Sequence, residues 1–344
     1  MRFTLSPANH NPHEHLSGRI RSGRASSRRA TIPVSMPDYT IGLDLGGTNL
    51  RAAAIDRDGR MLDKVSGATN FAAGREAVLS DIASAIIKLR DQHGRSGLAG
   101  IGIGVPGFIR MMQGIITNSP NMPYFEGVPI RDEISRRLEA PVILENDANA
   151  AALGEKWMGA GRGVDDLVLL TLGTGVGGGI ISGGRVLRGY VGMAGELGHI
   201  TVDPNGNPCG CGNRGCLEKH ASATAVTAMA HMLHLGENLT AKDVAELAAR
   251  TDETGDKART IWRVVGESLG IALAGLINAF NFPLYLLSGG MLPAWKYFEP
   301  DMTRVARERS YTFRATIQET KIAQATLGNE AGLYGAAYLP WVER

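Results

Sequence analysis

The chain has 344 residues, 44% of them hydrophobic, and a formal net charge of +2 at pH 7. At roughly 150 residues per domain, this length predicts two globular domains. The first 36 residues hold six Arg and one Glu, a local charge of +5 that leaves −3 for the rest of the chain. A mildly acidic body without a basic stripe argues against a nucleic-acid partner.

Residues 1–37 are predicted to form a disordered tail. They are rich in Arg, Ser, Gly and Pro with only scattered apolar positions, so they bury too little surface to offset the entropy of ordering. The segment lacks the apolar core of a secretory signal. Its Arg-rich, acid-poor composition resembles a transit peptide, but we favour a permissive extension upstream of Met36.

The cysteines and the longest apolar stretch indicate where in the cell the protein is located. All three Cys lie within residues 209–216, where they cannot build a framework of paired disulfides, so a reducing, cytoplasmic location is expected. The stretch Ile271–Leu287 is interrupted by Asn278, Asn281 and Pro283 and is shorter than the ~20 residues of a membrane span. It predicts a buried helix followed by a strand, and no membrane partner.

From Tyr39 onward, short apolar runs and Gly turns alternate with stretches of helical character. This alternation predicts an α/β fold with layers of helices and sheet. The predicted helices are Glu76–Arg90, Ile130–Leu138, Ala148–Lys156, Ala221–Leu235, Ala241–Ala249 and Ile261–Phe280.

A weak internal repeat relates the two halves. Residues Ile41–Thr48 align with Val168–Gly175 at an offset of 127, and each segment is an apolar strand that enters a Gly/Thr turn. A second strand follows each turn, at residues 50–55 and 179–181. One such hairpin in each half indicates two similar lobes with a cleft between them.

The lobe limits follow from this repeat. Residues 38–145 are predicted to form a small N-terminal lobe, completed by a C-terminal helix at residues 328–344. Residues 146–327 are predicted to form a larger lobe that includes the cysteine-rich segment.

The turn of the first hairpin contains Asp44, Gly46, Gly47, Thr48 and Asn49. Its glycines let backbone N–H groups approach an anion, and the Thr adds a hydroxyl donor, so the turn suits a phosphate. Asp44 could hold Mg²⁺ through water. Taken alone, a Gly-Gly turn is more often only a hairpin.

The second hairpin turn contains Gly173, Thr174 and Gly175, and its presence favours phosphate binding over an ordinary hairpin. Two phosphate-type turns in equivalent positions of two lobes can clamp a triphosphate from both sides. A third Gly pair, Gly289 and Gly290, follows an apolar strand and could seat an adenosine, although the local signal favours an ordinary strand-to-helix loop.

A cluster of polar residues follows the apolar strand that begins at Val142. Polar side chains at the carboxyl end of a strand in an α/β sheet point into the crevice where ligands bind. Asp147 is the candidate general base, taking a proton from an attacking hydroxyl. The alternative is that Asn146 or Asp147 only caps the following helix. Both hold if one residue caps and the other faces the cleft.

His199, Cys209, Cys211 and Cys216 match a closed Cys₃His zinc site. Four protein ligands leave no open position, so the zinc would be structural. The alternative, a redox pair of cysteines, is less consistent with a third Cys and a nearby His.

Sugar-binding groups flank this segment. If one ring nitrogen of His199 binds zinc, the other can donate to a sugar hydroxyl. Glu196, close before His199, and Glu218, two residues after the last Cys, could accept hydrogen bonds from vicinal sugar hydroxyls. Buried polar groups of this kind reject ligands that lack the matching hydroxyl.

These motifs resemble the ROK family of bacterial sugar kinases and repressors, from about Tyr39 to the C-terminus. The resemblance rests on five motifs in family order: Asp44-Leu-Gly-Gly-Thr-Asn, Glu145-Asn-Asp-Ala-Asn-Ala, Leu172-Gly-Thr-Gly-Val-Gly-Gly-Gly, Ala194-Gly-Glu-Leu-Gly-His and Cys209-Gly-Cys-Gly-Asn-Arg-Gly-Cys-Leu-Glu.

The resemblance implies a two-lobed actin-like ATPase (ribonuclease H-like) fold with an interlobe cleft, and use of ATP and Mg²⁺. It implies that Asp147 is the catalytic base. It also implies that Gly47, Thr48, Gly173 and Thr174 hold the phosphates, and that the sugar-side residues are Asn146, Glu196, His199, Glu218, Asn121 and Gly107. Relatives are commonly homodimers, which implies the same here by analogy.

The leading hypothesis is ATP-dependent phosphorylation of glucose at its 6-hydroxyl, because the compact cysteine motif looks most like glucokinases and N-acetylhexosamine kinases of this family. The nearest alternative is an N-acetylglucosamine or N-acetylmannosamine kinase. A sugar-responsive repressor would need an N-terminal helix-turn-helix, and residues 1–38 lack the required helical periodicity. An actin-like filament or chaperone ATPase would have no use for the sugar ligands.

Overall fold

The computed structural model describes residues 38–47, 49–117 and 123–343. The predicted tail and the predicted ligands Thr48 and Asn121 lie outside the described residues. The described chain from Asp38 falls within one compact unit.

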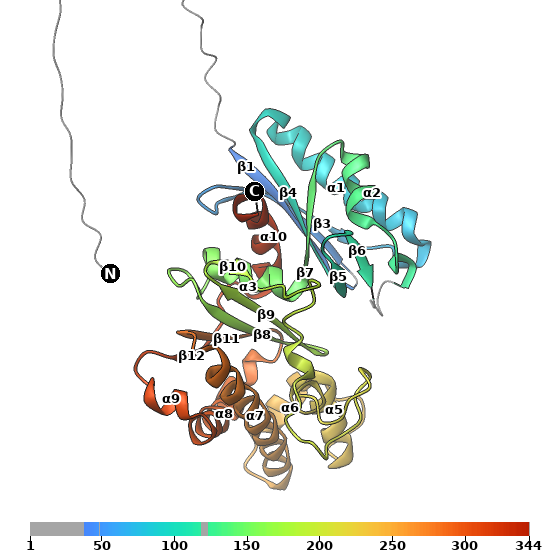
Figure 1. Cartoon of the computed structure of the whole chain (residues 1–344). Coiled ribbons are helices and arrows are strands. Elements are labelled where there is room, and N and C mark those ends of the chain that lie inside the picture. Colours follow the sequence, from blue (N-terminus) through green and yellow to red (C-terminus); the bar gives the residue numbers. More distant parts are fainter. Residues whose placement is uncertain (1–37, 48, 118–122, 344) are drawn as a thin grey trace, which may run out of the picture. The chain divides into compact units, whose positions relative to one another are not determined.

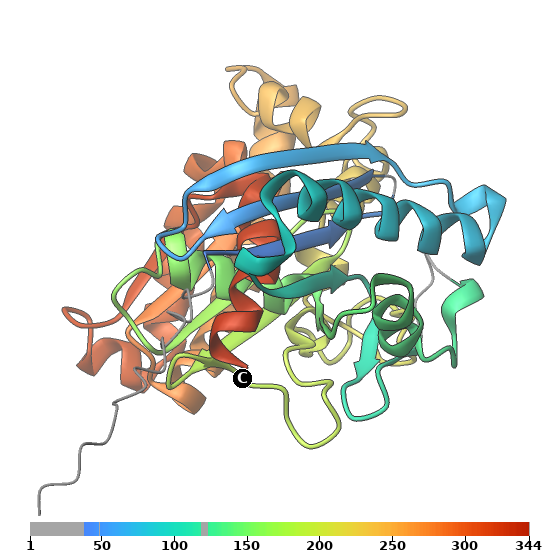
Figure 2. The same cartoon turned by 90° about the horizontal axis from the view of Figure 1, so that it is seen from above.

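The first sheet has five strands in the order β3-β2-β1-β4-β7. β1 pairs in parallel with β4, and β4 with β7, whereas β2 and β3 are antiparallel to their neighbours. The helices α1 and α2 cover one face of this sheet (Figures 1 and 2). The bounds are β1 Tyr39–Leu45, β2 Asn49–Asp56, β3 Met61–Ala68, α1 Arg75–His93, β4 Leu98–Val105, α2 Ile130–Leu138 and β7 Val142–Asn146. Between β4 and α2, β5 Phe108–Arg110 and β6 Ile115–Thr117 form a separate antiparallel pair.

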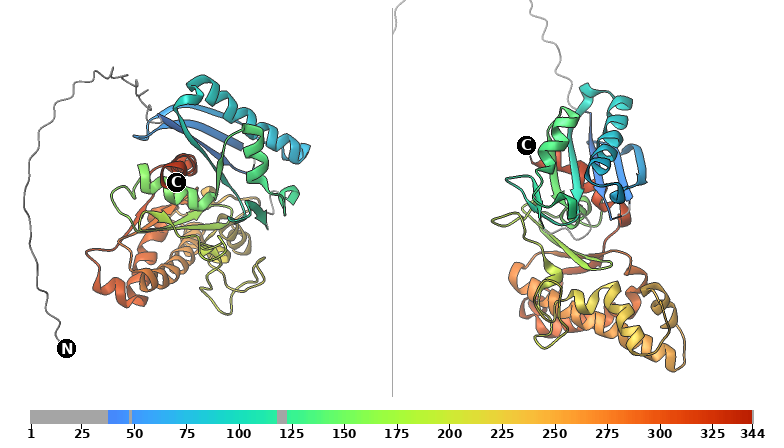
Figure 3. Two further views of the ribbon diagram at one scale, coloured as in Figure 1. Left: turned by 45° about the horizontal axis from the view of Figure 1, so that its top comes forward. Right: turned by 90° about the vertical axis from the view of Figure 1, so that its right-hand side faces the viewer.

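The second sheet repeats this plan, in the order β10-β9-β8-β11-β12. β8, β11 and β12 are parallel, and β9 and β10 extend the sheet in antiparallel fashion. Helices pack beneath it (Figure 3). The bounds are β8 Leu167–Leu172, β9 Val176–Ser182, β10 Arg185–Val186, α4 Glu218–Ala221, α5 Ala223–Met232, α6 Ala241–Leu247, α7 Glu253–Phe280, β11 Leu284–Ser288, α8 Trp295–Arg309, α9 Tyr311–Ala315 and β12 Lys321–Gln324.

The predicted repeat is confirmed by the two sheets. The first hairpin turns between Leu45 and Asn49, and the second turns between Leu172 and Val176, which preserves the offset found in the sequence. The two strand orders correspond position by position. The α/β, actin-like arrangement predicted above is therefore present.

Helices α3 (Asp147–Met158) and α10 (Ala331–Val342) pack against each other between the two sheets (Figure 1). Their contact is made through glycines: a Cβ at Gly335 would overlap the carbonyl oxygen of Ala150, and a Cβ at Gly154 would overlap that of Ala331. The C-terminal helix also packs on the first sheet, where the Thr40 hydroxyl donates to the Ala337 carbonyl at 2.7 Å. The lobe limits given above stay a prediction.

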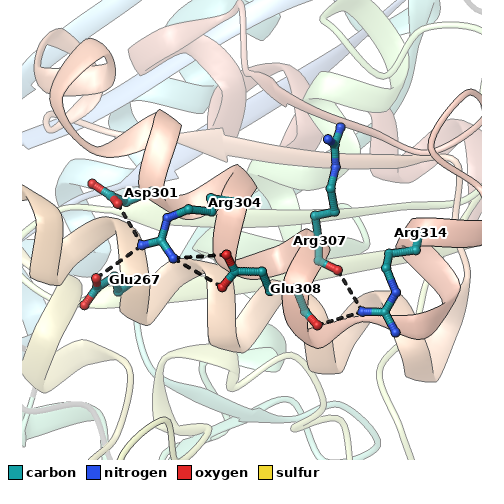
Figure 4. Close-up of polar contacts among 6 residues, drawn as sticks. All are labelled: Glu267, Asp301, Arg304, Arg307, Glu308 and Arg314. Atoms are coloured by element: carbon teal, nitrogen blue, oxygen red, sulfur yellow. Dashed lines mark hydrogen bonds and ion pairs between the residues drawn. The ribbon is translucent and has the colours of Figure 1, made fainter.

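The outer face of the α7–α8 pair carries an ionic cluster (Figure 4). Arg304 lies 2.9 Å from Asp301, 3.3 Å from Glu267 and 3.2 Å from Glu308. All of these groups are substantially solvent-exposed, so each pair contributes little to stability.

Most predicted helices are present, with informative differences. α7 begins eight residues before the predicted Ile261, because the Asp252 side chain caps it by accepting from the Gly255 N–H at 3.1 Å. The helix predicted at Ala221–Leu235 is broken at Ser222, whose backbone is extended and whose hydroxyl oxygen caps α5 by accepting from the Ala225 N–H at 3.1 Å. α8 was not predicted, because Pro300 lies inside it.

The stretch Ile271–Leu287 forms the end of α7 and the strand β11, as predicted. Within the described residues, α7 is long and apolar enough to cross a membrane, but 67% of its most apolar window is buried inside the protein. Such burial is typical of a core helix.

The glycine contact between α3 and α10 predicts opposite outcomes for two glycine substitutions. Gly335→Ala places a methyl group against the Ala150 carbonyl and is expected to lower the free energy of unfolding by about 1–3 kcal/mol or more. Gly275→Ala, in the exposed interior of α7 with open space around it, is expected to raise it by up to ~1 kcal/mol. Chemical denaturation measures both, and equal effects would contradict this account.

Candidate active site

A pocket of 370 Å³ brings together the predicted base and several of the predicted sugar-side and phosphate-side residues. The β7–α3 corner, the β8–β9 hairpin, the short 3-10 turn Leu197–His199 and the start of α4 all contribute to it. The predicted residues that line it are Gly107, Asn146, Asp147, Gly173, Gly175, Glu196, His199, Glu218 and Gly289. Residues from both hairpin-bearing halves of the chain therefore meet at one place.

Asn146 and Asp147 occupy different environments at the corner between β7 and α3. The Asn146 side-chain oxygen accepts from the N–H groups of Ala148 at 2.9 Å and Asn149 at 3.2 Å, which makes Asn146 the N-cap of α3. Its amide nitrogen donates to the Gly107 carbonyl at 3.2 Å. Asp147 faces the pocket. The capping interpretation is confirmed for Asn146, and the catalytic role of Asp147 stays a prediction that its place in the pocket permits.

The surroundings of the Asp147 carboxylate raise its pKa. More than a third of the residue is open to solvent in the pocket, yet protein surrounds it on the other sides, and this desolvation raises its pKa to about 6. The Ala148 N–H, 2.8 Å away, opposes the shift, and the nearby Asp44 charge adds to it. The group is mostly ionised at pH 7 and still able to accept a proton.

Three more ionisable groups share the pocket with Asp147. Burial raises the pKa of Glu196, His199 opposes this shift, and the charges of Asp147 and Glu218 add to it. Glu218 is seated against the second hairpin, where its Oε2 accepts from the Val176 N–H at 3.1 Å and packs against Gly175. The carboxylate of Glu218 therefore connects the predicted sugar side to the predicted phosphate side.

The predicted metal ligands form a tight cluster. The ligand atoms of His199, Cys209, Cys211 and Cys216 all lie within 4.8 Å of one another. Cys211 and Cys216 Sγ are 3.6 Å apart, and Cys209 Sγ is 3.7 Å from His199 Nδ1. A tetrahedral zinc with Zn–S bonds of ~2.3 Å would separate its ligands by about 3.8 Å, so the cluster fits such an ion. Because Nδ1 faces the cysteines, Nε2 is the nitrogen available to the pocket.

The second hairpin is held in a fixed form. The Gly173 N–H donates to the Gly175 carbonyl at 3.0 Å, and the Thr224 hydroxyl donates to the Thr174 carbonyl at 2.7 Å. Gly289 has a φ of 103° and packs against the Leu172 carbonyl, so only glycine fits there. Thr174 and Gly290 are exposed beside the pocket lining.

The first hairpin lines a different pocket. Gly46 and Asn49 border a separate space of 550 Å³ together with Arg51 and Asn329, and Gly47 is exposed. Asp44 is buried and paired with Arg51. Burial raises the pKa of Asp44, and the Arg51 charge opposes this. The described part of the structure does not place these first-hairpin residues in the pocket of Asp147, as a clamp around one triphosphate would require.

Several site residues were not predicted from the sequence. Phe108 and Thr171 line the pocket. Behind it, buried Glu145 and Asn149 contact the β7–α3 corner, and Arg188 reaches Glu145 from a distant loop. An acid inside an apolar strand was a usable signal for Glu145, whereas nothing in the sequence pointed to Arg188.

Comparison with solved structures identifies the class of fold. A ROK hexokinase from Thermus thermophilus is 35% identical, with a TM-score of 0.77 over 89% of this chain and 98% of that one. A ROK family glucokinase from Streptomyces griseus, solved with glucose and AMPPNP, is 33% identical, with a TM-score of 0.70 over 88% and 98% of the two chains. The protein therefore has the two-lobed actin-like ATPase fold of these sugar kinases.

The sequence comparisons identify the family. Residues 40–342 match the ROK family. A glucokinase from Thermotoga maritima is 39% identical over 311 residues, which cover 86% of this chain and 95% of the relative. A xylose repressor from Caldicellulosiruptor bescii is 31% identical over 86% of this chain and 76% of its own length. The chain belongs to the ROK family, which confirms the resemblance drawn from the five motifs.

The raised pKa of Asp147 predicts a pH-dependent cost in stability. Between the ordinary pKa of 3.8 and the value of about 6, the folded protein binds more protons than the unfolded chain, so this group lowers stability as pH rises through that window. Asp147→Asn is therefore expected to raise the free energy of unfolding more at pH 8 than at pH 4. The exposed Asp58→Asn variant is the control. A gain for Asp147→Asn that is the same at both pH values would contradict the shift.

Proposed function

We propose that this protein transfers the γ-phosphate of ATP to a hexose, with glucose as the leading substrate and its 6-hydroxyl as the acceptor. The observation that carries the proposal is the convergence of Asp147, Glu196, His199 and Glu218 with the Gly173–Gly175 turn in one pocket. A base, a set of hydroxyl-binding groups and a phosphate-type turn are the parts that phosphoryl transfer to a sugar needs. The ROK relatives named glucokinase support the choice of substrate.

In the proposed mechanism, the sugar lies between Glu196, His199 and Glu218, with the acceptor hydroxyl against Asp147. Glu196 and Glu218 accept hydrogen bonds from sugar hydroxyls, and His199 Nε2 donates one. Asp147 orients the acceptor hydroxyl and takes its proton as the new O–P bond forms and the bond between the γ-phosphorus and the β–γ bridging oxygen breaks, which leaves ADP. The backbone N–H groups of the glycine turns stabilise charge on the phosphate oxygens.

Mg²⁺ and zinc are the metal ions that this proposal implies. The Asp44 carboxylate is the candidate group for Mg²⁺, held through water, and the ion would neutralise charge on the phosphates. Zinc suits the closed Cys₃His cluster and would be structural, because four protein ligands leave no open position. Its effect on the chemistry is indirect: the cluster fixes Nδ1 of His199 and so orients Nε2 toward the sugar.

Two alternative functions share this fold, a kinase for another sugar and a sugar-binding regulator, and an activity assay distinguishes them. An N-acetylhexosamine kinase would use the same base and the same phosphate turns. A regulator would bind sugar without turnover, and the similarity to a xylose repressor makes this the rival of different class. We also propose a cytoplasmic location, because the clustered free thiols suit a reducing compartment, and a homodimeric assembly, by analogy with relatives of the family.

The function is tested by comparing kcat/KM for glucose, N-acetylglucosamine, N-acetylmannosamine, mannose and fructose with Mg·ATP. Glucose is expected to be preferred, and Asp147→Ala is expected to lower kcat by ~10²–10⁴-fold or more with little change in sugar affinity, because it removes the base. Asp58→Ala is the surface control. Retained turnover in Asp147→Ala would refute the role of the base, and absence of turnover with every sugar would refute the kinase proposal.

Loss of the metal cluster is expected to weaken both folding and sugar binding. Chelation, or Cys211→Ser, should lower the melting temperature and raise the sugar Kd, because both depend on the placement of His199. Elemental analysis and calorimetry measure the metal content and the affinity, and re-addition of Zn²⁺ to the chelated protein serves as the control. Sugar affinity that survives complete removal of the metal would show that the two are not coupled.

A further inference from the structure

A fully buried acid lies immediately before the Asn146–Asp147 corner. Glu145 is 1% exposed. Its Oε1 accepts from the Asn146 N–H at 2.9 Å and the Asn149 side-chain amide at 3.1 Å, and its Oε2 accepts from Arg188 Nε at 2.7 Å. Every one of these partners is a donor, so the carboxyl group fits its surroundings in the ionised form.

Arg188 supplies the charge that balances this acid. Its side chain is 19% exposed, and Nη2 lies 2.7 Å from Glu145 and 3.0 Å from Glu343, just beyond α10. Burial raises the pKa of Glu145, and the Arg188 charge is the largest opposing effect. A single guanidinium thus joins three segments: the end of β7, the loop after β10 and the segment after α10.

The backbone of Arg188 also begins the arm that carries Glu196. The Arg188 carbonyl accepts from the Ala194 N–H at 3.0 Å, which closes the loop of residues 188–194. Gly195 follows with a φ of 100°, and a Cβ there would lie 3.4 Å from the side-chain oxygen of Asn149. Glu196 comes next and enters the pocket. Arg188 therefore contacts the supports of both the base and a sugar-binding carboxylate.

We propose that Arg188 is a positioning residue for phosphoryl transfer, which through Glu145 and its own loop holds Asp147 and Glu196 in one fixed relative geometry. This inference rests on the proposed kinase function. Arg188 lies outside the pocket lining, so its effect on the reaction is carried by the groups it holds. A buried acid and a distant arginine arranged in this way are expected where a site needs its side chains locked by surrounding contacts.

The variants are chosen to change the charges of Glu145 and Arg188 separately and together. Arg188→Met leaves a buried carboxylate without its counter-charge, which is strongly unfavourable. Adding Glu145→Gln removes that charge as well, so the double variant separates loss of stability from loss of positioning. Arg304→Met is the matched control, because Arg304 also bridges several carboxylates, on the outer face of α7 and α8 (Figure 4). All three variants are compared with the full-length wild type.

We expect Arg188→Met to lower kcat at least tenfold and to raise the KM for the sugar at least tenfold, with the KM for ATP changed less than threefold. The double variant should recover most of the lost melting temperature but less than a tenth of the wild-type kcat/KM. Arg304→Met should stay within twofold of the wild type in every constant. A role in folding alone would instead lower the apparent kcat with both KM values unchanged.

Three results would overturn the proposal. The first is wild-type kcat and KM in a folded Arg188→Met protein. The second is wild-type kcat/KM in the double variant, which would show that the pair only cancels charge. The third applies if Arg188→Met does not fold. The folded double variant and Arg188→Lys are then compared with the wild type, and wild-type kcat and KM in both would refute the positioning role. Absence of turnover in the wild type refutes the kinase proposal itself and is recognised before any variant is compared.

Discussion

The close contact between α3 and α10 is the constraint on which the rest of the structure depends. Gly154 and Gly335 have no room for a side chain, because each faces a backbone carbonyl of the other helix. α3 begins at Asp147, so the position of this helix sets the position of the proposed base. α10 packs at the same time on the first sheet. The position of the proposed base at the start of α3 therefore depends on the packing of this helix against α10.

Buried glutamates hold α3 near both of its ends. Glu145 precedes it and is balanced by Arg188. Glu155, fully buried near its end, accepts from the N–H groups of Leu327 at 2.7 Å and Ala160 at 2.8 Å. Each acid connects segments far apart in the chain, and each accepts hydrogen bonds from protein donors. Unpaired, either carboxylate would cost several kcal/mol, so these contacts specify the arrangement as well as stabilise it.

Features encoded in short segments could be predicted from the sequence. The two hairpins, the Cys₃His cluster and the Asn146–Asp147 corner depend on local spacing. The repeat between the halves predicted two similar lobes, and the two five-stranded sheets share one strand order. Arg188 and its partner Glu343 could not be predicted, because nothing local relates residues 155 positions apart that meet only in the folded chain. α8 was missed because Pro300 disfavours a helix locally, and the packing of Phe298 and Met302 in the core outweighs that preference.

The two halves of the predicted phosphate clamp differ in how they are held. Glu218 contacts Val176 and Gly175, so the sugar side and the second hairpin form one connected unit. The first hairpin lines another pocket, and its Asp44 is paired with Arg51. The candidate sugar ligands lie in one pocket with the second hairpin, whereas Gly46 and Asn49 of the first hairpin line the other pocket. A clamp around one triphosphate would therefore require the two hairpins to approach each other, as the closure of a two-lobed kinase would bring about.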